Sequence, residues 1–121
     1  MEKIIEICKR KCHIYENGSP EALLLQLMGE DETPSLGSQL AFMCEYANKP
    51  FLFVGVEVND WFNELSPWPA PPVFGRQAFG SGARQTLDEI TRNILPEIIN
   101  ITPSLKGAKK VIGGYSLAGL F

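Results

Sequence analysis

The sequence contains one histidine, three cysteines and no long apolar run, and each scarcity excludes a class of protein. An odd, widely spaced set of cysteines does not form the paired framework of a small disulfide-rich secreted domain. No apolar run approaches the ~20 residues that a membrane-spanning helix needs. The amino terminus also lacks the apolar stretch and small-residue cleavage site of a secretory signal. We therefore expect a cytoplasmic protein that does not enter the membrane.

Positive charge and metal ligands are scarce as well. The net charge of −3 gives no general attraction to nucleic acid or acidic membranes. The basic cluster at residues 9–11 is expected to be a solvated strand face or end, with a contact site as the alternative. Cys8, Cys12 and His13 lack a second ligand pair, so we expect packing thiols, no metal and no cofactor. Cys44 is expected in or near the core.

The 121 residues, of which 45% are apolar, suffice for one globular domain. Apolar patterning and turn residues predict an outer strand in 3–15 and a strand at 22–28, joined as a hairpin by a turn at 17–20. The elements predicted after them are, in order, a polar loop at 30–34, a helix capped by Ser35, a strand at 51–58, a loop at 59–81, a helix capped by Ser81 and a strand at 109–113. Leu87, Ile90, Ile94 and Ile98 predict the buried stripe of the last helix, which Pro96 should kink or end near Leu95. Strands that alternate with helices indicate an α/β fold with parallel pairing through right-handed crossovers.

The loop at 59–81 differs in kind from the rest of the chain. Four prolines exclude a regular helix or central strand there: Pro67, Pro69, Pro71 and Pro72. Five large rings argue against disorder: Trp61, Phe62, Trp68, Phe74 and Phe79. A long ordered loop of this kind is typical of a functional segment.

The most informative stretch is Gly114-Tyr115-Ser116-Leu117-Ala118-Gly119, which directly follows the last predicted strand. A nucleophile elbow places a serine on a tight strand-to-helix turn, and small residues must flank it so that strand and helix do not collide. Gly114, Ala118 and Gly119 supply those small residues. The turn would expose the Ser116 hydroxyl and aim the Leu117 N–H at a developing oxyanion. A Gly/Ser-rich turn that merely closes a buried strand is the alternative.

At these residues the sequence resembles the α/β-hydrolase family, and within it the putative-esterase branch that includes esterase D and the enterochelin esterases. The resemblance covers the whole chain in element order, and its motif is confined to 114–119. Ala118 stands where the strict G-x-S-x-G pattern has glycine, and we treat it as a tolerated variant. The stretch "VGVEVNDWFNELSPWPAP" resembles the loop that follows the third strand and helps build the active-site rim. The fold implied is a partial α/β-hydrolase fold: a mostly parallel sheet with an antiparallel amino-terminal strand pair and flanking helices.

The resemblance also implies roles for single residues. Ser116 would attack a small-molecule ester, with Leu117 as one oxyanion donor and backbone near Asn59, Asp60 or Trp61 as the other. Trp61 and Trp68 would line the substrate pocket, although they could instead only cover the sheet end. Asp60 could equally cap the loop.

A serine nucleophile needs a base and an acid, and family members place both after the serine. No acid or histidine follows Ser116, and His13 on a predicted outer strand is a poor base. We therefore expect residues 1–121 to be one incomplete domain, the amino-terminal half of a larger serine esterase, inactive in isolation. The alternatives are a non-catalytic remnant, which could form homo-oligomers through the open edge of strand 109–113, and a site completed by another chain.

Overall fold

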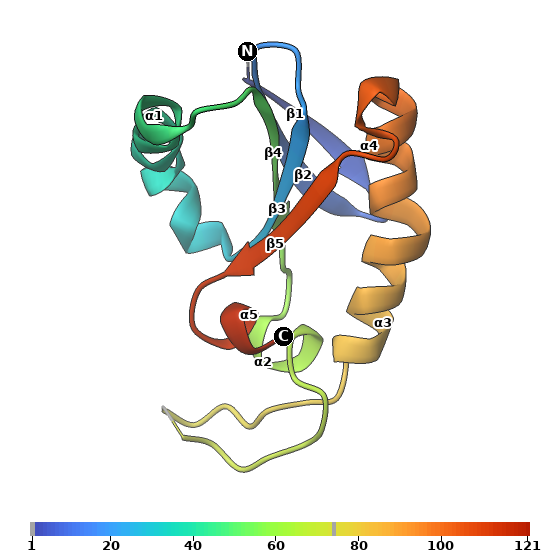
Figure 1. Ribbon diagram of the computed structural model, residues 1–121. Coiled ribbons are helices and arrows are strands. Elements are labelled where there is room, and N and C mark those ends of the chain that lie inside the picture. Colours follow the sequence, from blue (N-terminus) through green and yellow to red (C-terminus); the bar gives the residue numbers. More distant parts are fainter. Residues whose placement is uncertain (1, 74) are drawn as a thin grey trace.

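A computed structural model describes residues 2–73 and 75–121, which form one sheet with helices on both faces (Figure 1). The strands are β1 (Glu2–Ile7), β2 (Arg10–Asn17), β3 (Ala22–Met28), β4 (Phe51–Glu57) and β5 (Lys109–Gly114). The α-helices are α1 (Leu36–Tyr46), α2 (Trp61–Glu64), α3 (Ala83–Glu89), α4 (Leu95–Ile101) and α5 (Leu117–Leu120). Short 3-10 helices η1 (Glu30–Ser35) and η3 (Pro103–Leu105) and a π-helical turn, η2 (Ile90–Ile94), complete the set. None of the helices in these ranges is long and apolar enough to cross a membrane.

The sheet has the strand order β1-β2-β4-β3-β5. The strands β3, β4 and β5 run parallel, whereas β2 runs antiparallel to both of its neighbours, β1 and β4. The predicted α/β class, with a parallel core and an antiparallel amino-terminal pair, is therefore confirmed. The sheet is covered by α1 on one face and by the run from α3 to α4 on the other (Figure 1).

The amino-terminal pair is not made of the strands that the sequence predicted. The segment 3–15 is not one outer strand but the hairpin of β1 and β2, which turns at Cys8 and Lys9. Both turn residues have positive φ, 54° and 61°, as a tight hairpin that matches the strand twist requires. Neither residue is a glycine, which is why the sequence did not reveal the turn. The strand β2 is consequently an inner strand of the sheet, and β3 pairs parallel with both of its neighbours.

Alternation along the strands divides the core in two. On β3, alternate leucines (Leu23, Leu25 and Leu27) pack with the isoleucines of the α3–α4 run, while Met28 packs with α1. The strand β4 is buried over its whole length, as its near-continuous apolar sequence predicted.

Of the two predicted helix caps, one lies at the predicted residue. Ser35 is the N-cap residue of α1, but its hydroxyl makes no capping bond and instead donates to the Glu32 carbonyl, because residues 30–35 form η1 rather than a loop. At α3 the N-cap residue is Gly82, not Ser81.

The long helical run changes character in its middle, next to the point where Pro96 was predicted to kink or end it. Pro96 does not end it: the chain passes from α3 through the π-turn η2 into α4 and stays helical to Ile101. Ile90, Ile94 and Ile98 are buried as predicted, whereas Leu87 is 43% exposed. The long loop likewise contains one helical turn, α2, and an isolated bridge between Ala70 and Phe79. Phe74, one of the five predicted loop rings, lies outside the described residues.

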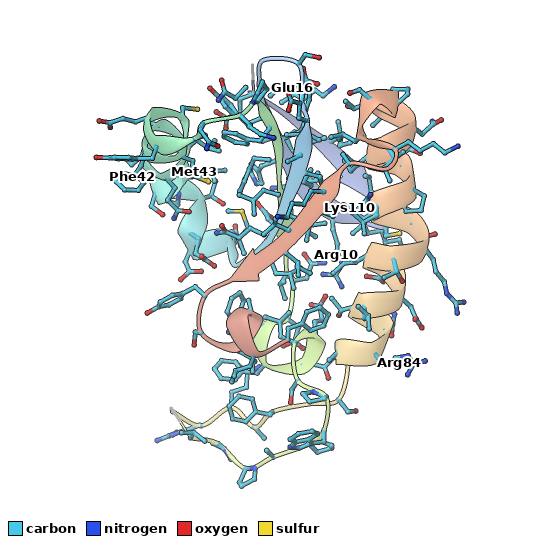
Figure 2. The ribbon with its side chains drawn as sticks, in the orientation of Figure 1. Arg10, Glu16, Phe42, Met43, Arg84 and Lys110 are labelled. Carbon is cyan, nitrogen blue, oxygen red and sulfur yellow. The ribbon has the colours of Figure 1, made fainter. Side chains whose placement is uncertain are left out.

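Arg10 corrects the expectation of a solvated basic cluster, because it is only 4% exposed. Its guanidinium forms ion pairs with Glu64 of α2 and with Glu89 of α3, the latter at 2.7 Å between Nε and Oε2. It also donates to the Glu57 carbonyl at the end of β4, 3.3 Å away. Figure 2 shows Arg10 on the side of the sheet that faces α3. Burial opposes the charge, but the two carboxylates outweigh burial and raise the pKa of Arg10.

Removing this guanidinium should destabilise the fold. We expect Arg10→Ala to lower the free energy of unfolding by about 3–5 kcal/mol, because it leaves two half-buried carboxylates without their partner. The matched control is Arg84→Ala, which removes an exposed pair with Asp88 and should cost less than about 0.5 kcal/mol. Urea titrations followed by circular dichroism measure both variants. Equal losses would contradict the role assigned to Arg10.

The three cysteines are free thiols in different settings: Cys8 is exposed, Cys12 buried and Cys44 half-buried. Burial raises the pKa of Cys12 to about 11, so very little thiolate forms at pH 8. We expect iodoacetamide at pH 8 to alkylate Cys8 in the folded protein and to reach Cys12 only in denaturant. Peptide mass spectrometry measures this, with Cys8→Ser as control. Equal alkylation of Cys8 and Cys12 in the native state would contradict the burial argument.

Candidate active site

The turn after β5, where the sequence predicted a nucleophile elbow, is tight and places a serine at positive φ. The strand ends at Gly114, α5 begins at Leu117, and Ser116 between them has φ 57° and ψ −122°. A non-glycine residue in this region costs of order 1–3 kcal/mol, so surrounding contacts must hold it there. The Gly119 N–H donates to the Ser116 carbonyl and the Ala118 N–H to the Tyr115 carbonyl. Ser116 is left exposed, and the Leu117 N–H in the first turn of α5 has no acceptor within its own helix.

The small residues of the motif have a steric reason. A Cβ on Gly114 would lie 2.6 Å from the Ala118 carbonyl carbon and 2.6 Å from its Cβ, a separation that atoms do not tolerate. A Cβ on Gly119 would lie 3.1 Å from the Gly114 carbonyl oxygen. Ala118 itself is 6% exposed and packs into the core, which explains why alanine is accommodated at that position.

An open cavity of about 770 Å³ lies beside the elbow. Its walls come from the carboxyl ends of three neighbouring strands and the segments that follow them. The residues are Gly29, Glu30, Asp31, Glu32, Glu57, Val58, Asn59, Trp61, Phe62, Tyr115 and Ser116. Ligands of open parallel sheets bind at this edge, outside the carboxyl ends of the strands.

The wall nearest to Ser116 in the sheet follows β3, and the sequence did not predict it. Because β3 pairs directly with β5 and Leu27 faces Gly114, the residues after β3 come beside the elbow. The Gly29 N–H donates to the Glu32 carboxylate, 2.7 Å away. The N–H groups of Glu30 and Asp31 begin η1 and have no acceptor within that helix. In α/β-hydrolases that have a nucleophile elbow, a strand-to-helix loop in this position donates to the oxyanion.

The oxyanion donors that the sequence predicted after β4 lie one strand further from Ser116 than the loop after β3 does. Asn59 and Trp61 line the cavity with Ser116, whereas Asp60 does not. Asp60 occupies the N-cap position of α2, and its N–H donates to the Glu64 carboxylate. Trp68 is 68% exposed, and it is not one of the described residues that line this cavity.

The one histidine is held away from the serine. His13 lies on β2 in a row that continues through Gly55 and Gln26 to Gly113 on β5. Three strand spacings of ~4.8 Å put its backbone ~14 Å from β5, too far for a hydrogen bond to Ser116. Its Nε2 lies 2.7 Å from the Glu57 carboxylate, and the ring is 3% exposed. The sequence predicted that His13 lies on an outer strand. His13 does lie on a strand, but β2 is an inner strand of the sheet.

Four carboxylates face or flank the cavity, on Glu30, Asp31, Glu32 and Glu57, and no lysine or arginine is among its lining residues in the described chain. The cavity mouth is therefore electronegative. No group of three or more potential ligands that could hold a metal ion occurs within the described ranges.

Comparison with known proteins identifies the fold. No family model matches the sequence, and no curated protein matches it. Among solved structures, the IroE-like serine hydrolase from Shewanella oneidensis superposes over 99% of this chain with a TM-score of 0.71 and 20% identity. Siderophore hydrolase EstA from Aspergillus nidulans superposes over 99% with a TM-score of 0.66 and 13% identity. The chain has the fold of the amino-terminal part of these proteins and spans 43% and 49% of their lengths, respectively.

Two neighbouring glycines differ in the room around them and so test whether the turn after β5 is crowded. We expect Gly114→Ala to destabilise the protein by about 1–3 kcal/mol, because the new methyl group overlaps the Ala118 backbone. Gly113→Ala meets nothing within 4 Å and should change stability by less than about 0.5 kcal/mol. Urea unfolding compares the two variants. Amide exchange at Ala118 and Gly119 should accelerate only in the first variant, and identical behaviour would contradict the argument.

Proposed function

We propose that this chain forms the amino-terminal half of a serine ester hydrolase whose nucleophile is Ser116. The observation that carries the proposal is the serine's positive φ on a crowded strand-to-helix turn, beside a cavity of about 770 Å³. A strained, exposed serine at the carboxyl edge of a parallel sheet has no evident structural purpose. It is the arrangement that acyl transfer requires.

The mechanism follows from the positions of the backbone donors. Ser116 Oγ attacks the ester carbonyl, and negative charge develops on the carbonyl oxygen. The Leu117 N–H is one donor to this oxyanion. We assign the second donor to the backbone of Glu30 or Asp31, because β3 neighbours β5. The donors first expected after β4, at Asn59, Asp60 or Trp61, are one strand spacing further away.

The base and acid are not supplied by the residues described. His13 is engaged with Glu57 and lies about three strand spacings from the serine. Both groups would therefore come from polypeptide beyond these 121 residues, and the activity belongs to that larger protein. In isolation the chain should bind weakly and turn nothing over.

The substrate is a small-molecule ester. The cavity offers the rings of Trp61 and Phe62 on one wall and carboxylates on another. The Aspergillus structures of this fold are siderophore hydrolases, which makes a siderophore-like ester the first substrate to try. The cytoplasm remains the proposed compartment, on the basis of three free thiols.

A non-catalytic role is the second candidate. It is favoured by the outer edge of β5, which pairs with no strand of the described residues and where Val111 and Ile112 are exposed. It requires only that copies of the chain associate through that edge.

The proposal predicts a difference between the isolated chain and the protein from its native source. The 121-residue chain should hydrolyse p-nitrophenyl acetate no faster than its Ser116→Ala variant. The native protein, treated with a fluorophosphonate, should have a mass above 13.4 kDa and carry one adduct on Ser116. Its Ser116→Ala variant should lose at least about 10³-fold in kcat.

Two outcomes contradict this function. Hydrolysis by the 121-residue chain that disappears in Ser116→Ala would show that the base lies within it. A native protein of 13.4 kDa without an adduct would leave only the non-catalytic candidate.

A further inference from the structure

Glu57 is a buried carboxylate in the wall of the Ser116 cavity. It is the last residue of β4 and is only 8% exposed. His13 Nε2 lies 2.7 Å from its Oε1, and the Thr33 hydroxyl donates to the same oxygen, 3.5 Å away. Because an ionised carboxylate only accepts hydrogen bonds, Nε2 carries the proton of the first bond, and a neutral imidazole suffices for it. Two separate segments, β2 and η1, thus fix the orientation of this side chain.

The second carboxylate oxygen of Glu57, Oε2, is left to bind something else. Within the described residues, the hydrogen bonds to the Glu57 side chain all go to Oε1. Every fully buried side-chain oxygen or nitrogen of the described residues has a hydrogen-bond partner, so Oε2 is not sealed inside the protein. Since Glu57 lines the cavity, the cavity is where Oε2 emerges. A buried carboxylate is costly to keep, and a link between β2 and η1 alone would need only one acceptor oxygen.

Further negative charge lies at the mouth of the cavity, on η1. Glu30 and Asp31 are exposed, and their carboxylates make no hydrogen bond or ion pair with the part of the chain that the structure describes. Glu32 differs from them, because its carboxylate accepts from the Gly29 N–H. The positive charge that would balance Glu30 and Asp31 is therefore not supplied by the described residues, and a cationic ligand would supply it.

Aromatic rings lie close to these carboxylates. Trp61 and Phe62 line the same cavity. A Cβ on Gly29 would lie 3.6 Å from Trp61 Cε3 and 2.5 Å from Asp31 Oδ1, so the ring and the carboxylate lie against the same glycine. Rings and carboxylates together attract an organic cation, whereas a metal ion needs several converging oxygen ligands. The described ranges contain no such group of three or more potential metal ligands.

We propose, resting on the function proposed above, that the ester cleaved at Ser116 carries an ammonium group, which binds Glu57 Oε2 inside the cavity. The carboxylates of Glu30 and Asp31 attract the cation to the cavity mouth, and Glu57 holds it while the ester carbonyl lies at the serine. A hydroxyl group could also donate to Oε2, but it would gain nothing from the charge at the mouth. The site thereby selects cationic esters over neutral esters of the same size.

The register of the sheet gives the span that such a substrate must cover. Glu57 pairs with Met28 on β3, and Leu27 pairs with Gly114 on β5. Continued by one residue, this register puts Tyr115 beside Met28. Glu57 and Tyr115 are therefore two strand spacings apart, ~10 Å between backbones, and one small molecule can reach both ends of the cavity.

The charge preference of the cavity can be measured without any turnover. We expect the native protein to bind n-butylammonium at least about tenfold more tightly than 1-butanol, which has the same number of heavy atoms but no charge. Butanoate should bind more weakly than either, and high salt should reduce the preference. Calorimetric titration with each compound measures the three affinities. Equal affinities for n-butylammonium and 1-butanol would overturn the proposal.

Variants assign the preference to the residues named. Glu57→Gln keeps the size of the side chain and should reduce the preference at least about fivefold. The joint variant Glu30→Gln with Asp31→Asn changes only exposed side chains and should reduce it about threefold. The matched control is Glu45→Gln, which removes an exposed carboxylate of α1 outside the cavity and should leave the preference unchanged.

Circular dichroism checks that each variant is folded. A preference that folded Glu57→Gln retains would overturn the proposal. Should Glu57→Gln not fold, a preference that the joint variant retains would overturn it instead.

A second experiment joins the cation site to the proposed nucleophile. An aminohexyl fluorophosphonate should label Ser116 at least about tenfold faster than its heptyl analogue, and Glu57→Gln should bring the two rates together. Mass spectrometry of the native protein measures both rates. Equal rates would overturn the cationic substrate and leave the proposed function intact, because both probes would still label Ser116. A native protein that neither probe labels would contradict the proposed function, and the cationic substrate with it.

Discussion

The buried guanidinium of Arg10 is the interaction on which the arrangement of the carboxyl edge depends. It joins β2 to the end of β4, to α2 and to α3, which are separated in the sequence by up to 79 residues. A charge that is 4% exposed tolerates only one geometry, the one in which both carboxylates reach it. Arg10 therefore holds in place the cavity wall that carries Trp61, although Arg10 does not itself line the cavity.

Local pattern was sufficient for the crowded turn after β5 and for the class of fold. The small residues around Ser116 predicted a crowded turn, and a Cβ on Gly114 would indeed lie only 2.6 Å from the Cβ of Ala118. The apolar run of β4 predicted a strand buried on both faces, and alternation of strands and helices predicted the parallel core. These features depend on side-chain size and periodicity within one element, which a sequence displays directly.

Features that depend on partners distant in sequence were missed. Arg10 was expected in solvent because its neighbours Lys9 and Lys11 are charged, and only the fold brings Glu64 and Glu89 to it. The hairpin at Cys8 was missed because its turn lacks glycine. The wall after β3 was missed because the order of strands in the sheet differs from their order in the chain, so that β3, not β4, adjoins β5.

The π-turn between α3 and α4 also affects how this fold can vary in length. Buried isoleucines spaced four apart, at 90, 94 and 98, would drift around an ideal α-helix, which has 3.6 residues per turn. A π-turn closes its hydrogen bonds one residue later and so accommodates the extra residue locally. The segment therefore holds one residue more than a plain α-helix between the same endpoints. Loss of a single exposed residue such as Arg92 would restore regular α-helix, so a relative shorter by one residue here could keep the same contacts with the sheet.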